Sequence, residues 1–166
     1  EHVIEKQTID FKDRANRDVF GYYVDSGYIS FQGFFIRQGK LLERNMSITP
    51  LYEDEMDAFT SFIMQYYEKN VVPKEILVSP GTPVDVLKEA LNTNVHIPVR
   101  GEKKKLIDLV YKNAKEAHEQ KFKLVFRKDN ELRQANETLS KIFNADIHTV
   151  EMFDNSHIQG TFNVSG

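Results

Sequence analysis

The chain has 166 residues and a formal net charge of −3, and 40% of its residues are hydrophobic. This composition is ordinary for a globular domain, and the charge gives no overall attraction to nucleic acid. The absence of cysteine excludes disulfides and thiolate metal sites, and the apolar runs are too short to cross a bilayer.

The first part of the chain changes from polar to strand-like. Residues 1–17 are polar with a few apolar residues at helical spacing, which indicates the end of a helix and a linker. Aromatic and β-branched residues then dominate, and Asp25-Ser26-Gly27 and Arg37-Gln38-Gly39-Lys40 interrupt them as turn signals. This pattern predicts three antiparallel strands at 18–25, 28–37 and 40–48.

Shorter elements follow. Thr49-Pro50 is typical of a helix start, with Thr49 as N-cap, and predicts a helix over 52–69 whose acidic first turn suits the helix dipole. Residues 75–79 (EILVS) predict a buried strand. A second helix is expected to start at 82–85, with Asp85 completing a capping box. Residues 95–99 predict a short strand, and Pro98 indicates that this strand lies at an edge of the sheet or ends there.

The last third is helical by its pattern. Residues 102–143 contain no Gly or Pro and predict either one long helix or two helices with a break near 123–130. Residues 148–154 predict a final strand. The element order over 18–143 is β-β-β-α-β-α-β-α. This order predicts an α/β fold of the ribonuclease H-like type with a mixed sheet.

The most specific stretch is EMFDNSHIQGTF at 151–162. It resembles the opening of the endonuclease domain of the UvrC family, the incision subunits of bacterial UvrABC excinucleases, in the pattern E-x-F-D-x-S-x-x-x-G. RDVFGYYVD, FFIRQGKLLER, PKEIL, KNAKEA and EHVIEKQ resemble the region before that domain. The resemblance divides the chain into the end of a UvrB-binding hairpin with a linker (1–17), a ribonuclease H-like domain with a long helix (18–143) and the start of the endonuclease domain (144–166). Glu1 in place of Met and the end at Gly166 fit a piece cut from a longer protein.

The resemblance also implies chemistry and partners. It makes Asp154 the family's first catalytic carboxylate and a ligand of Mg²⁺ or Mn²⁺ in the full-length protein. Two-metal cleavage needs several such ligands, so we expect no complete site, and no bound cofactor, in this chain. The parent would bind UvrB through the upstream hairpin and incise damaged DNA in nucleotide-excision repair and the SOS response. It would be cytoplasmic, without a membrane or a small-molecule substrate.

Residues 18–143 could be an inert relative of the nuclease domain that follows. Asp25 ends the first strand as Asp154 ends a later one, but Ser79 stands at the end of the fourth strand, where active members of the fold carry another Asp. Asp25 would then lack its partner and bind a metal poorly. The alternative is that Asp25 is simply a turn residue before Ser-Gly.

Residues 100–128 are unusually basic. They contain ten basic and four acidic residues, which gives a local net charge of +6. On a helix, such lysines can hold DNA phosphates without reading sequence. The alternative is a solvated helix face. The candidate DNA contacts are Arg100, Lys103, Lys104, Lys105, Lys112 and Lys115.

Two other functions stay open besides a structural, DNA-positioning domain. A free-standing metal-dependent nuclease would need Asp25, Glu53 or Asp57, and Asp154 to converge. A protein-interaction module would use the aromatic residues of 18–36 as its surface. The five histidines make no zinc pattern, so they favour neither.

Overall fold

The computed structural model describes residues 14–143. Its first three strands are β1 (Arg17–Asp25), β2 (Tyr28–Arg37) and β3 (Lys40–Pro50). They form two successive antiparallel hairpins, as the turn signals predict. Both turns have two central residues with positive φ, Ser26-Gly27 and Gln38-Gly39, which is the backbone that matches the twist of a two-residue hairpin.

The first helix, α1 (Glu55–Tyr67), begins later than Thr49-Pro50 predicts. Thr49 and Pro50 instead belong to β3, where Thr49 is opposite Ile29, so strand pairing overrides the local helix signal. The N-cap is Asp54, whose Oδ1 accepts a hydrogen bond from the Met56 amide at 2.8 Å. The acidic first turn is confirmed.

The next elements are β4 (Glu75–Val78), α2 (Val84–Leu91) and β5 (Asn94–His96). The expected capping box at Asp85 is wrong, because the N-cap of α2 is Pro83, which has no side-chain acceptor. The Thr82 hydroxyl donates instead to the Ser79 carbonyl at 2.6 Å. This bond holds the loop that leaves β4.

The five strands form one mixed sheet in the order β3-β2-β1-β4-β5. β1 pairs with β2 antiparallel and with β4 parallel, and β4 pairs with β5 parallel. The ribonuclease H-like arrangement expected from the element order is therefore present. The chain places β5 at an edge, as Pro98 predicts.

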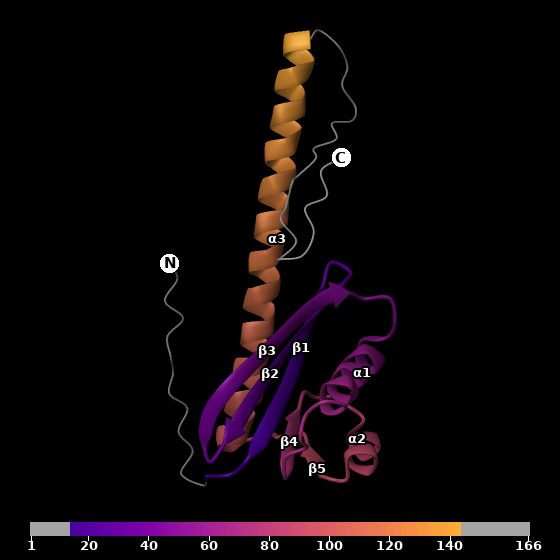
Figure 1. Cartoon of the computed structure of the whole chain (residues 1–166), viewed down its shortest axis with the longest axis vertical. Coiled ribbons are helices and arrows are strands. Elements are labelled where there is room, and N and C mark those ends of the chain that lie inside the picture. Colours follow the sequence, from indigo (N-terminus) through magenta and orange to yellow (C-terminus); the bar gives the residue numbers. More distant parts are fainter. Residues whose placement is uncertain (1–13, 144–166) are drawn as a thin grey trace, which may run out of the picture. The chain divides into compact units, whose positions relative to one another are not determined.

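Helices cover both faces of the sheet (Figure 1), with α1 and α2 on one face and the first part of α3 (Gly101–Phe143) on the other. On the α1 side, Phe20 is fully buried and Phe31 stacks on Phe62 with ring centroids 4.4 Å apart. On the α3 side, Val110 packs so closely that a Cβ on Gly21 would lie 2.7 Å from its Cγ1. The sheet is thus a central layer between two helical layers.

Helix α3 is continuous over Gly101–Phe143, which confirms one long helix and not the alternative of two helices with a break near 123–130. The chain does divide there into two compact units, with the boundary between Phe122 and Lys123. Residues 101–122 bury one stripe against the sheet, whereas Leu124 and Phe126 of the second unit are exposed. No described helix is long and apolar enough to span a membrane. The predicted strand at 148–154, and most of 1–17, lie outside the described residues.

Candidate functional site

A cleft opens at the carboxyl ends of β1 and β4. In the sheet, β1 lies between β2, which follows it in the chain, and β4, so the strand order reverses at β1. Ligands of open α/β sheets bind at such a point. The cavity here has a volume of about 400 Å³. We call it the strand-end cleft and define it by the side chains of Tyr22, Tyr23, Glu55, Ser79, Lys104, Asp108 and Tyr111.

Asp25 and Ser79 are not brought together, so the expectation that they occupy paired positions is wrong. The parallel register aligns Phe20 with Val78, which sets Gly21 beside Ser79. A Cβ on Gly21 would lie 3.2 Å from the Ser79 Oγ. Asp25 is four residues further along β1, roughly 13 Å away at the usual rise of a strand. It sits at the Ser26-Gly27 turn, and the turn-residue alternative accounts for it.

The acidic residues reach the cleft from two helices. Glu55, at the start of α1, accepts a hydrogen bond from the Tyr22 hydroxyl at 3.4 Å, and Asp108 on α3 is bonded to Lys104. Within residues 14–143, no group of three or more His, Cys, Asp or Glu side chains could hold a metal ion. Glu53 lines another groove, and Asp154 lies outside the described residues. Asp25, Glu53 and Asp57 thus form no metal-binding group within the described residues, and their convergence with Asp154 stays a hypothesis.

The hydroxyl of Tyr22 is held neutral. Burial, followed by the nearby carboxylates of Glu55 and Asp54, raises the pKa of Tyr22 to about 12. A tyrosine in this state donates a hydrogen bond but does not serve as a base near neutral pH. The cleft thus has the features of a binding site more than those of an acid–base site.

The candidate DNA contacts on α3 are mostly engaged in ion pairs. Lys103 bonds to Glu75 on β4, which gives it a structural role. The others pair along the helix at spacings of three or four residues, namely Lys104 with Asp108, Lys105 with Glu102 at 2.9 Å, Lys112 with Glu116 at 3.8 Å and Lys115 with Glu119 at 3.9 Å. Arg100 precedes the helix and is exposed.

These pairs divide into tight and loose ones. The lysines at 112 and 115 lie furthest from their partners, and their side chains are 70% and 46% exposed. Exposed pairs of this kind are worth only a few tenths of a kcal/mol, so either lysine can exchange its carboxylate for a phosphate at little cost. Among the paired lysines, Lys112 and Lys115 are therefore the ones that the structure leaves most available.

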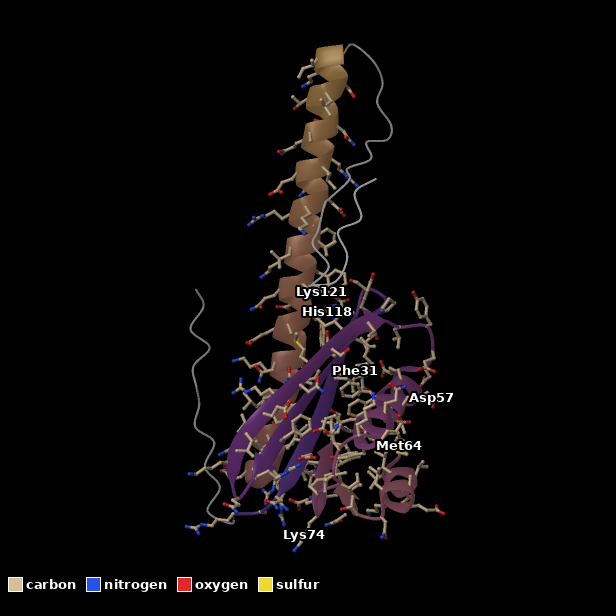
Figure 2. All side chains as sticks on the ribbon, viewed as in Figure 1. Phe31, Asp57, Met64, Lys74, His118 and Lys121 are labelled. Atoms are coloured by element: carbon tan, nitrogen blue, oxygen red, sulfur yellow. The ribbon has the colours of Figure 1, made fainter. Side chains whose placement is uncertain are left out.

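Two buried polar groups escaped the sequence analysis. The carboxylate of Asp18, fully buried in β1, binds the Arg37 guanidinium and accepts a hydrogen bond from the Tyr67 hydroxyl at 2.6 Å. His118, which Figure 2 labels on α3, is also buried, with its Nδ1 3.0 Å from the Ser30 Oγ. The sequence signal for Asp18 was an acidic residue inside a strand-like run. The signal for His118 was its place on the apolar stripe of α3.

Comparison with known proteins identifies the family of the chain. Residues 16–121 match the family described as the UvrC Ribonuclease H-like domain. The UvrABC system protein C of Lactobacillus acidophilus is 44% identical over 170 residues, which cover 99% of this chain and 28% of that protein. The chain thus spans just over a quarter of that relative's length.

Among solved structures, the catalytic domain of human Endonuclease V is 14% identical, with a TM-score of 0.31 over 48% of this chain and 39% of that one. The fold assignment rests on the strand order and the family match instead. With a family match over more than half of its length and a 44% identical relative over 99% of it, the chain belongs to the UvrC family, and residues 16–121 are its ribonuclease H-like domain.

Proposed function

We propose that the chain is a non-catalytic, DNA-positioning part of the incision subunit of the UvrABC excinuclease. In the parent protein it would connect the UvrB-binding hairpin to the endonuclease domain in nucleotide-excision repair in the cytoplasm. Damaged DNA and UvrB would be the partners, and Mg²⁺ or Mn²⁺ would be held by the endonuclease domain, with Asp154 as one ligand. The family membership and the 44% identical relative support this assignment.

One observation carries the non-catalytic part of the proposal. Where β1 and β4 lie side by side at the cleft, they present Gly21 and Ser79, neither of which is a strong ligand for a divalent cation. Glu55 and Asp108 alone supply too few oxygen ligands for two-metal cleavage. Position 21 also requires a glycine, because a Cβ there would clash with Val110 of α3.

The DNA-positioning part rests on the exposed cations of α3. Contacts from Lys112 and Lys115 to phosphates would be independent of sequence, which suits a protein that must act wherever damage occurs. Each neutralised phosphate contributes to the fall of affinity with salt, so the number of contacts is measurable.

The test uses the 166-residue chain and a duplex that carries a bulky lesion. Fluorescence anisotropy at two salt concentrations measures binding, and a denaturing gel after addition of Mn²⁺ measures cleavage. We expect salt-sensitive binding without cleavage, and a salt slope that falls by about two when Lys112→Glu and Lys115→Glu are combined. The matched control is Lys69→Glu with Lys88→Glu, which makes the same charge change on exposed lysines of the α1–α2 side.

Three outcomes would count against the proposal. Undetectable or salt-independent binding would remove the DNA-positioning part and leave a spacer. Equal losses in the α3 pair and the control pair would reduce the effect to net charge. Cleavage that disappears with Asp25→Asn would make this part of the chain an active nuclease.

A further inference from the structure

The strand-end cleft has an aromatic wall that the proposed function does not use. Tyr23 and Tyr111 meet edge to face, with ring centroids 5.8 Å apart and an interplanar angle of 74°. Tyr111 is 47% exposed, so part of its ring is open to the solvent. The ammonium group of Lys115 lies 5.8 Å from the centre of the Tyr23 ring, so a cation already contacts this wall.

The charge in the cleft favours a positive ligand. Asp108 and Lys104 neutralise one another, while Glu55 forms no ion pair with any residue in 14–143 and accepts a hydrogen bond from the neutral Tyr22 hydroxyl. Asp54 adds to the negative potential, since it also raises the pKa of Tyr22. The cleft therefore carries an uncompensated negative charge, which attracts cations and repels phosphates.

The floor of the cleft holds a polar group without a protein partner among the described residues. Ser79 is only 6% exposed, yet its side chain lines the cavity, and its Oγ forms no hydrogen bond with any residue in 14–143. The bonds that reach Ser79 from Thr82 go to its backbone carbonyl. The Ser79 Oγ is not among the fully buried unpaired polar atoms of residues 14–143, so it is open to the cleft, where it can accept a hydrogen bond from a ligand.

We propose that the strand-end cleft binds the guanidinium group of an arginine side chain presented by a partner protein. The planar cation would stack on Tyr111 and donate to the Glu55 carboxylate and the Ser79 hydroxyl. Arginine fits better than lysine, because its flat group stacks on aromatic rings and carries five donors in a fixed fork. The volume of about 400 Å³ is enough for one such side chain.

A nucleotide is the main competing ligand, since an aromatic wall also stacks bases. Its phosphate would face the excess charge of Glu55 and Asp54, and the one lysine of the cleft is already bonded to Asp108. Lys112 and Lys115 are not lining residues of the cleft, although Lys115 contacts the Tyr23 ring of its wall, so arginine binding and DNA binding are tested by different variants.

The test titrates the ¹⁵N-labelled 166-residue chain with a capped Ala-Arg-Ala tripeptide and follows amide shifts by NMR. We expect saturable shifts at Tyr22, Glu55, Ser79 and Tyr111. The same peptide with citrulline, which has the shape of arginine without its charge, should bind at least about tenfold more weakly. Tyr111→Leu should weaken arginine binding about three- to fivefold.

Paired variants separate the site from general charge. Glu55→Gln should weaken binding of the arginine peptide about tenfold, whereas Glu53→Gln, the same change two residues away on the wall of another groove, should leave it within about twofold. Equal effects of the two variants, equal affinity for the citrulline peptide, or no shifts up to roughly 10 mM peptide would overturn the proposal. Tighter binding of deoxyadenosine monophosphate at the same amides would also overturn it and assign the cleft to nucleotides.

Discussion

The basic run of α3 and the single carboxylate of Asp18 show that the number of charges in a region does not predict how much they contribute to stability. The run is conspicuous in the sequence, but four of its eight lysines lie beside a carboxylate on the same helix. Asp18 is one residue in a strand, yet it is fully buried and bonded to Arg37 and Tyr67. Burial and partners, not number, decide what a charge contributes to stability.

The buried group also ties distant parts of the domain together. Asp18 belongs to β1, Arg37 to the end of β2 and Tyr67 to the last turn of α1. The Arg37 guanidinium donates in addition to the Ile36 carbonyl at 3.0 Å. The α3 pairs, by contrast, join residues one turn apart on the same helix. They connect no elements that the helix backbone does not already connect.

The largest effect is expected from Arg37→Met, which keeps much of the side-chain length and removes the charge. Asp18 would remain buried with only the Tyr67 hydroxyl, and breaking a buried pair from one side is costly. We expect the free energy of unfolding at pH 7 to fall by about 3 kcal/mol, measured by urea denaturation. Lys105→Met, at an exposed pair, is the control and should change it by less than about 0.5 kcal/mol. Similar losses in both variants would show that the buried pair has no special weight.

The sequence predicted this fold where local pattern and final pairing agree. The alternation of aromatic and polar residues and the two Gly-containing turns located β1, β2 and β3 nearly to the residue. The prediction failed at Thr49-Pro50, since pairing of β3 with β2 decides that these residues are strand. A helix-start signal is local, whereas the strand partner lies about twenty residues earlier in the chain.

The candidate site was less predictable, because it depends on register. Asp25 looked like the counterpart of Asp154 from its place at a strand end, but only the pairing of β1 with β4 shows that Gly21 is the neighbour of Ser79. The lysine pairs of α3 were within reach of the sequence, since Lys112 and Glu116 are four residues apart. Tyr111 gave no signal, because a tyrosine on an amphipathic helix is usually part of the core.

A second test concerns the proton of Asp18. Burial outweighs the hydrogen bonds from Arg37 and Tyr67, so the pKa of the Asp18 carboxyl is raised above its ordinary value of 3.8. The folded chain therefore keeps this proton at pH values where the unfolded chain has lost it. The resulting stabilisation is complete below pH 3.8 and is lost as the pH rises through the folded-state pKa.

Asp18→Asn isolates this contribution, because an amide does not titrate. We expect the free energy of unfolding of the unaltered chain, minus that of the variant, to decrease as the pH is raised from below 3.8 to neutrality. Urea denaturation across that range measures the difference. A difference that grows with pH would mean that the partners lower the pKa of Asp18 more than burial raises it.

The smallest effect is expected from Lys112→Gln combined with Lys115→Gln. The variant removes two exposed ion pairs and the contact of Lys115 with the Tyr23 ring, so the free energy of unfolding should fall by no more than about 1 kcal/mol. Thermal unfolding at low and high salt measures this, and high salt should shrink the difference further. A loss as large as that of Arg37→Met would contradict the view that these lysines are structurally dispensable. If the loss is small, weaker DNA binding by variants at these positions reflects lost phosphate contacts, since the fold that presents them is intact.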